Sequence, residues 1–209
     1  MRGYITIEGQ ATAEIEEKKS RFIGHVRHVE TEDDALAMIE EVRSEHRMAR
    51  HNVYAYVLRG EGSSERVRYT DDGEPQKTAG LPTLEAIHHA GLTDVCLVTT
   101  RYFGGTLLGT GGLVRAYTQA AQAAIEAAQV VEVSRCVDVS VTLPYPLYDL
   151  ATRIANDCGA KAMDTQFTDQ VLLRLRMLEG TQEPLLTKLA EMLKGSEGVA
   201  VSEPFDAML

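Results

Sequence analysis

Tryptophan is absent from the 209 residues of this chain, and aromatic residues make up only 6% of it. A surface that stacks successive bases of a single strand needs several aromatic side chains, so no such platform is expected. Only three cysteines are present, Cys96, Cys136 and Cys158, and no C-x-x-C occurs. The odd number and the wide spacing exclude a disulfide scaffold, and we expect free thiols in a reducing compartment.

Long apolar runs are also missing. No stretch approaches 18 consecutive apolar residues, and the N-terminus lacks the apolar core of a secretory signal. We therefore expect a soluble, cytoplasmic protein with no membrane partner. The six histidines form neither H-E-x-x-H nor a His-x-x-x-His pair, and G-x-S-x-G does not occur. These absences predict no zinc site and no catalytic residue.

Positive charge is scarce as well. Lys and Arg number 21 against 31 Asp and Glu, which gives a formal net charge of -10. The deficit is spread along the chain, since residues 1–134 carry 14 basic and 20 acidic side chains, and residues 135–209 carry 7 and 11. Neither half is basic, which argues against a protein that coats nucleic acid. A small, local site for an anion is still compatible with this composition.

Apolar periodicity and turn residues predict a two-domain α+β chain, with domains over residues 1–133 and 134–209. In the first domain we expect two strands within 4–17, strands at 21–29, 53–58, 66–70 and 95–100, and helices at 31–46, 84–90 and 113–128. Thr31 before three acidic residues predicts the first helix start. From about residue 134 the expected order is β-α-β-β-α-β, the split βαβ or ferredoxin-like pattern.

The segment 71–75, Asp-Asp-Gly-Glu-Pro, must be a loop, because Asp-Gly and Glu-Pro both break regular structure. Two interpretations of its carboxylates stay open. Asp71, Asp72 and Glu74 are oxygen ligands of the kind that Mg²⁺ prefers. Alternatively the aspartates cap their own turn and Gly73 supplies a positive φ.

A glycine-rich stretch after the expected strand at 95–100 is the strongest candidate for a binding site. Gly104, Gly105, Gly109, Gly111 and Gly112 lead into a helix, a geometry in which backbone N–H groups bind phosphate. Arg101 and Arg115 flank the stretch and can add charged contacts to an anion. The spacing matches neither a P-loop nor G-x-G-x-x-G, so a tight crossover or a macromolecular contact surface remain alternatives.

Further candidates for binding an anion, a nucleic acid or a partner are spread over four other segments. Thr78 and Gly80 precede a helix, where exposed backbone N–H groups suit an anion, with the helix itself expected to start at Pro82 or Thr83. His51 comes just before a strand. A short basic cluster lies at 18–21. The complete set of candidates is Arg101, Tyr102, Gly104, Gly105, Gly109, Gly111, Gly112, Arg115, Lys77, Thr78, Gly80, His51, Lys18, Lys19 and Arg21.

These segments resemble the YigZ family, whose first domain is shared with the eukaryotic Impact proteins. The resemblance rests on blocks in the family's order, at 18–23, 45–46, 49–51, 71–75, 78–80 and Pro82. Its most specific part is the stretch from Arg101 to Gly105 together with Leu108 to Val114, Ala116 and Tyr117. One departure is Lys77, where family members usually carry a small residue, often glycine.

The resemblance implies a fold and a cellular setting. The first domain is expected to resemble a domain of a small-subunit ribosomal protein, and the second the ferredoxin-like C-terminal domain of elongation factor G. Impact proteins regulate translation, so the expected function is a non-enzymatic binding or regulatory protein near translation. Its expected partner is RNA, the ribosome or a translation-associated protein, and it needs no cofactor. The alternative is a Mg²⁺-dependent enzyme or a nucleotide- or phosphate-binding protein that uses the acidic loop and the glycine-rich stretch.

Overall fold

A computed structural model of the chain describes residues 3–60, 64–195 and 198–208. The chain divides into two compact units, one over Tyr4–Val131 and the other from Glu132 onward together with Gly3. Both units combine helices with β-strands, which confirms the two-domain α+β organisation. Among the described residues, no helix is long and apolar enough to cross a membrane.

The first unit is built on a five-stranded sheet in which every neighbouring pair is antiparallel. The strand order is β2-β3-β6-β4-β5, formed by β2 (Gln10–Glu17), β3 (Ser20–His28), β4 (His51–Arg59), β5 (Glu65–Thr70) and β6 (Val95–Tyr102). A further strand, β1 (Tyr4–Glu8), makes an isolated parallel bridge from Ile5 to Leu92. Gly9 divides β1 from β2, so the two strands predicted within 4–17 are both present.

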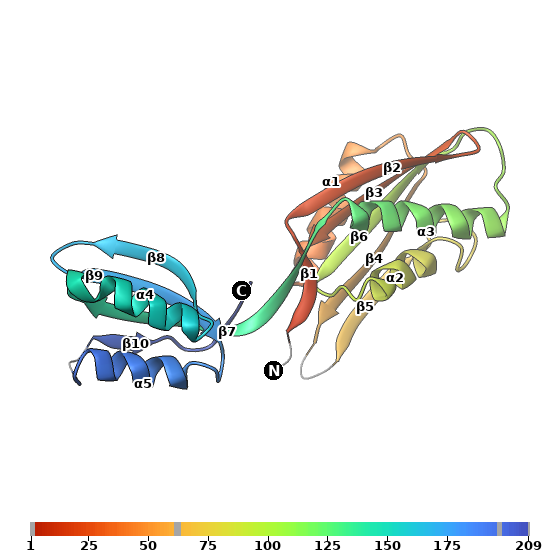
Figure 1. Ribbon diagram of the computed structural model, residues 1–209. Helices are drawn as coiled ribbons and strands as arrows, with labels where there is room; N and C mark the ends of the chain where they lie inside the picture. The colour runs from red at the N-terminus through yellow and green to blue at the C-terminus, as the bar shows by residue number, and fades with distance from the viewer. Residues whose placement is uncertain (1–2, 61–63, 196–197, 209) are drawn as a thin grey trace. The chain divides into compact units, whose positions relative to one another are not determined.

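Helices cover both faces of this sheet (Figure 1). Alternate residues of a strand point to opposite faces, so the central strands β4 and β6 contribute to two cores. Ala55 and Leu97 pack with α2 (Gly80–His89) and α3 (Thr110–Glu126), while Tyr56 and Cys96 pack beneath α1 (Glu32–Glu45). This burial on both faces explains why β6 has an uninterrupted apolar run at its start.

Helix α1 begins where the sequence predicts it. Thr31 is the N-cap, its hydroxyl accepts from the Asp34 backbone N–H, and the Asp34 carboxylate accepts from the Thr31 backbone N–H. This reciprocal arrangement satisfies two donors that the first turn of a helix leaves unpaired. His46 closes the helix as its C-cap.

Two helix starts differ from the prediction. Helix α2 begins at Gly80 rather than at Pro82 or Thr83, and α3 begins at Thr110 rather than at Leu113. Gly111 and Gly112 therefore lie in the first turn of α3 instead of in a loop. The connection between β4 and β5 falls partly on residues 61–63, outside the described residues.

The second unit has the ferredoxin-like order of elements. It contains β7 (Gln129–Leu143) from Glu132 onward, a 3-10 turn η1 (Tyr145–Leu147), α4 (Tyr148–Asp157), β8 (Lys161–Phe167), β9 (Val171–Leu178), α5 (Glu183–Met192), β10 (Val199–Val201) and β11 (Phe205–Met208). The strands pair in the order β10-β7-β9-β8, all antiparallel, as the split βαβ pattern requires. One core packs α4 and α5 against one face of the sheet. The last strand, β11, was not predicted; it pairs with the beginning of β7.

Candidate functional site

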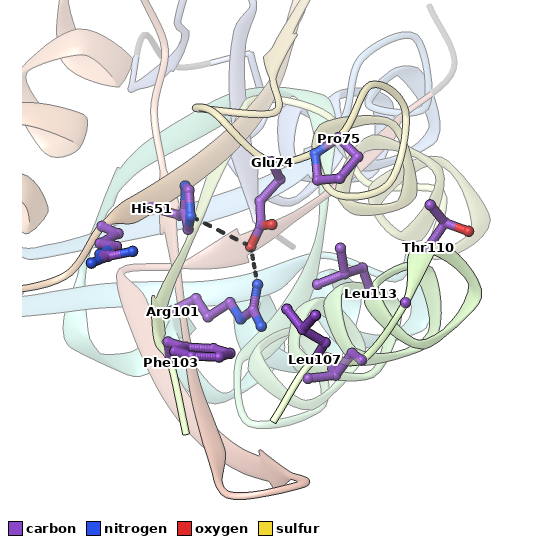
Figure 2. A pocket seen from close by; sticks show the side chains of 11 residues that line it. His51, Glu74, Pro75, Arg101, Phe103, Leu107, Thr110 and Leu113 are labelled. Carbon is purple, nitrogen blue, oxygen red and sulfur yellow. Dashed lines mark hydrogen bonds and ion pairs between the residues drawn. The ribbon is translucent and has the colours of Figure 1, made fainter. Parts of the chain in front are cut away.

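A pocket of about 430 Å³ opens at one end of the first unit's sheet. There β4 begins, β6 ends and α3 begins, because neighbouring antiparallel strands start and stop at the same edge. The pocket combines charged, small and apolar side chains (Figure 2). Its lining is Arg50, His51, Glu74, Pro75, Arg101, Phe103, Leu107, Leu108, Gly109, Thr110 and Leu113.

Arg101 is the buried cation of this pocket. Its side chain is only 7% exposed, and its Nη1 donates a 2.6 Å hydrogen bond to Glu74 Oε1. The guanidinium carbon lies 5.5 Å from the centre of the Phe22 ring and 5.6 Å from that of Phe103, a range in which an aromatic face attracts a cation. The Nε of Arg101 is buried, and no described residue provides it with a hydrogen-bond acceptor.

Glu74 holds this arrangement together from the loop before α2. Its side chain is 5% exposed, and its Oε1 accepts hydrogen bonds from Arg101 and, at 2.9 Å, from the Tyr117 hydroxyl. Burial, and then the charge of Glu74, raise the pKa of Tyr117 far above its usual range, so Tyr117 keeps its proton and donates. Figure 2 shows the Glu74 carboxylate between the side chains of His51 and Arg101.

His51 presents one ring nitrogen to the same carboxylate. Its Nδ1 lies 2.7 Å from the backbone carbonyl oxygen of Asp72, and a carbonyl can only accept, so Nδ1 carries a proton. The other nitrogen, Nε2, lies 4.0 Å from Glu74 Oε1. His51, one of the predicted binding residues, therefore lines the pocket.

The N-terminus of α3 forms another wall of the pocket. Gly109, the N-cap, has φ of 72°, and no side chain in the described part of the chain caps the helix. The helix pairing begins with the N–H of Leu113, which donates to the Gly109 carbonyl. The three preceding N–H groups, including that of Thr110, have no partner within the helix, and such a terminus favours negative charge.

Arg115 lies beside this helix terminus. Its Nη1 is 4.0 Å from the position that a Cβ on Gly111 would occupy, and its side chain is exposed. Gly112 packs more tightly, because a Cβ there would lie 3.0 Å from the Leu108 Cβ. Of the predicted glycines, Gly109 lines the pocket and Gly111 lies next to it, whereas Gly112 has a packing role.

Tyr102, Gly104 and Gly105 do not line the pocket. Tyr102 follows Arg101 on β6 and points to the other face of the sheet, where its hydroxyl lies 3.0 Å from His46 Nδ1. A Cβ on Gly104 would lie 2.0 Å from the carbonyl carbon of Lys19, so this glycine allows the end of β6 to pack on the β2–β3 turn. Gly105 has φ of 84° and open space around it.

The predicted magnesium ligands are engaged by different partners. Asp71 accepts from the backbone N–H groups of Lys77, Ala79 and Gly80, and so caps α2 from a distance. Asp72 accepts from the backbone N–H of Asn52, and Glu74 is directed into the pocket. Within the described ranges no three His, Cys, Asp or Glu side chains are grouped to hold a metal ion. Gly73 has the positive φ of the turn interpretation, at 86°. The two aspartates, however, accept from backbone donors at the start of α2 and on β4 instead of capping their own turn.

The segment that joins this loop to α2 is tightly packed. The Thr78 hydroxyl donates to the Pro75 carbonyl, and a Cβ on Gly80 would lie 2.5 Å from the Thr70 carbonyl oxygen. Lys77 has φ of 62°, in the left-handed region that favours glycine. The small residue that the resemblance to the YigZ family leads us to expect here would adopt this positive φ more easily than lysine. The exposed Lys77 side chain adds a positive charge at the same end of the domain.

The basic cluster at 18–21 divides in two. Lys18 and Lys19 form the turn between β2 and β3 with φ of 47° and 66°, and both side chains are exposed. Arg21 instead forms a bidentate pair with Glu14 across the hairpin, with both distances 2.8 Å. Only the two lysines of the cluster are without a recorded ion pair among the residues described.

Sequence reasoning missed several side chains of the pocket. Arg50 adjoins His51 and precedes a strand, so its position was a usable signal. Phe103 and Leu107 are 51% and 83% exposed. They lie just before and within the glycine-rich stretch, a further signal because large apolar residues are unexpected in an exposed loop. The link from Glu74 to Arg101 and Tyr117 joins residues 27 and 43 positions apart, and no local pattern indicates it.

Comparison with known proteins finds a matching domain family in each of the two units. Residues 18–125 match the Impact N-terminal domain, and residues 141–196 match a domain of unknown function, DUF1949. The chain is 32% identical over 196 residues to the IMPACT family member YigZ of Escherichia coli strain K12, covering 94% of this chain and 96% of that protein.

Two further relatives show the same relationship. The IMPACT family member YvyE of Bacillus subtilis strain 168 is 41% identical over 133 residues, which cover 63% of this chain and 60% of that protein. A crystal structure described as that of a hypothetical protein is 31% identical and has a TM-score of 0.63, covering 96% of this chain and 97% of that one. From these matches and the fold, the chain belongs to the IMPACT family.

Proposed function

We propose that this protein is a non-catalytic regulatory protein that acts near translation by binding RNA, with one phosphate group held in the pocket beside Arg101. The translational setting follows from the resemblance to the Impact proteins, and family membership supports it. The choice of RNA over a protein partner follows from the chemistry of the pocket.

The observation that carries this proposal is the unpaired Nε of Arg101. A buried donor without an acceptor costs free energy, of the order of 1–3 kcal/mol, unless a ligand or water supplies the acceptor. The uncapped N-terminus of α3 lines the same pocket and adds backbone donors. A phosphate has enough acceptor oxygens to serve both sets of donors at once.

The charge around the pocket supports a ligand with several phosphates. Within the pocket Glu74 balances Arg101, which leaves the exposed Arg50 as the additional cation. Lys18, Lys19, Lys77 and Arg115 are also exposed, and they lie in turns or helix starts at the same end of the sheet. No ion pair is recorded for any of these four within residues 3–60, 64–195 and 198–208. A local basic end on an acidic protein is compatible with a small RNA contact area.

The apolar wall of the pocket supports a nucleotide rather than an isolated anion. Phe103 and Leu107 are strongly exposed, and Leu113 lies deeper. A base adjacent to the bound phosphate would cover these side chains and remove apolar area from water. Single-stranded RNA provides such an accessible base, whereas a duplex keeps its bases stacked.

The test is fluorescence anisotropy with a labelled single-stranded RNA at 50 and 200 mM salt. If four phosphates are contacted, the affinity falls about 50-fold over this range, because bound counterions are released. Arg50→Gln is expected to weaken binding by about tenfold, the cost of losing one hydrogen bond to a charged group. Arg153→Gln is the matched control, since Arg153 is an exposed residue of α4 outside the pocket.

Two results would contradict the proposal: no binding to RNA at 50 mM salt, or an equal effect of the Arg50 and Arg153 substitutions. In the first case, capture of a translation factor that persists after nuclease treatment would identify the protein-partner alternative. Competition by a mononucleotide, with no gain from a longer RNA, would identify the nucleotide-binding alternative. A magnesium-dependent enzyme is less well supported, because Asp71, Asp72 and Glu74 already serve separate partners.

A further inference from the structure

Two histidines that are far apart in the sequence meet on the face of the first unit that α1 covers. His25 lies on β3 and His46 is the C-cap of α1. Their Nε2 atoms are 3.2 Å apart, and the side chain of His46 is only 12% exposed. The 21-residue separation explains why no ligand-spacing motif indicated them.

The opposite nitrogens of both rings face hydroxyl groups. His46 Nδ1 lies 3.0 Å from the Tyr102 hydroxyl, and His25 Nδ1 lies 3.3 Å from the Thr12 hydroxyl. When each Nδ1 donates its proton to a hydroxyl oxygen, both Nε2 atoms direct lone pairs at the space between the rings. An imidazole that binds a metal is held in the same way, with its remaining N–H donated to a polar group.

The spacing of the two Nε2 atoms also fits a metal. Zinc binds histidine nitrogens at about 2.0–2.1 Å in a tetrahedral arrangement, which places two such nitrogens roughly 3.3 Å apart.

A carboxylate is within reach as a further ligand. Glu45 Oε1 lies 4.0 Å from His46 Nε2, and the Glu45 side chain is 66% exposed and can rotate. Glu45 and His25 line the same cavity of about 170 Å³ between β2, β3 and α1. The other acid of that cavity, Glu41, is paired with Arg27 at 2.8 Å. In the present side-chain conformations, the described residues contain no group of three metal-ligating side chains. The Glu45 side chain must therefore rotate toward the two histidines to complete a three-ligand site.

We propose that His25 and His46, joined by Glu45, bind one divalent transition-metal ion of the zinc class, with water in the remaining position. Two imidazoles and one carboxylate suit Zn²⁺ and its neighbours rather than Mg²⁺ or Ca²⁺, which prefer oxygen ligands alone. The site is independent of RNA binding, since neither histidine lines the pocket beside Arg101.

The experiment is a titration of the chelator-treated full chain with Zn²⁺ at pH 7.5 by calorimetry, and with Co²⁺ by visible absorption. We expect one equivalent to bind and the Co²⁺ spectrum to be that of a tetrahedral site. His25→Gln and His46→Gln should each lower the affinity at least tenfold, since even the loss of an outer partner costs about this much. His88→Gln, a change at an exposed position of α2, is the matched control and should leave the affinity unchanged.

His46→Gln alters a helix C-cap and can affect folding, so circular dichroism accompanies each variant. His25→Gln lies within a strand and tests the site even if the His46 variant unfolds. Glu45→Gln, at an exposed position, should weaken binding without changing the fold. Failure to bind either metal below millimolar concentration, or equal binding by wild type and His25→Gln, would overturn the proposal and leave the pair as a hydrogen bond between two rings.

Discussion

Arg101 Nη1 and Glu74 Oε1 lie 2.6 Å apart, in an ion pair whose two side chains are at most 7% exposed. The pair joins the end of β6 to the loop before α2, and the Tyr117 hydroxyl of α3 donates to the same oxygen. Three elements of the first unit therefore converge on one carboxylate. Because buried charges are costly unless they are paired, this contact positions Arg101 in the pocket and stabilises the fold at the same time.

Glu74→Gln should lower the free energy of unfolding by about 3 kcal/mol, because it leaves the buried Arg101 charge without an opposite charge. Urea denaturation followed by circular dichroism measures this loss. The double variant Glu74→Gln with Arg101→Met removes the unpaired charge and should recover part of the stability. A loss below about 1 kcal/mol in the single variant would show that water screens the pair.

Gly104→Ala should destabilise the first unit by at least about 2 kcal/mol, the usual cost of forcing an extra group into a packed site. Its Cβ would lie 2.0 Å from the Lys19 carbonyl carbon and 2.4 Å from the Ser20 backbone nitrogen, and neither backbone atom can move independently. The hydrogen bond from the Gly104 N–H to the Ser20 hydroxyl would also be strained. Thermal unfolding of the variant checks this, and an unchanged melting temperature would contradict the packing role.

Gly111→Ala is the matched substitution in the same glycine-rich stretch, and we expect it to stabilise the protein rather than destabilise it. Gly111 is in the first turn of α3, with an ordinary φ, and its Cβ would meet only Arg115 Nη1 at 4.0 Å. Replacing a helical glycine by alanine should stabilise the protein by about 0.5–1 kcal/mol. If RNA phosphate approaches the α3 terminus, the added methyl group should nevertheless weaken binding severalfold. Unaltered RNA affinity in this variant would place the phosphate elsewhere in the pocket.

Local structure could be predicted from the sequence more readily than contacts between distant segments. Strands, helices and the Thr31 cap follow from local periodicity and short-range hydrogen bonding, and they were predicted closely. The start of α3 was predicted three residues late, because glycine is unfavourable in helices and the run 109–112 favours a loop. The helix starts directly after Gly109, which adopts a positive φ before the first turn.

The site was harder to predict because its contacts join distant segments. The carboxylates of 71–74 suggested a metal site, whereas Asp71 caps a helix whose first residue is nine positions away. Arg101 and Tyr102 are adjacent, and only their places on opposite faces of β6 direct one into the pocket and the other to His46. The His25–His46 contact depends on how α1 packs on the sheet, which no sequence spacing encodes.

Tyr56→Phe should raise the pKa of Glu32 toward the ordinary value of 4.5. The Tyr56 hydroxyl donates to the Glu32 carboxylate, and this hydrogen bond is the largest of the effects that lower that pKa, with Arg68 and Arg66 adding smaller ones. A carboxylate whose pKa is lowered by folding stabilises the folded state above its unfolded pKa, and the stabilisation is lost as pH falls through the folded value. The wild type should therefore lose more stability than Tyr56→Phe as the pH falls below 4.5.

A ¹³C NMR titration of the Glu32 carboxyl carbon measures the shift of its pKa directly. Tyr54→Phe removes a hydroxyl from the neighbouring stacked ring and is the control. An equal change of the Glu32 pKa in both variants would show that the arginines, not the Tyr56 hydroxyl, determine its value.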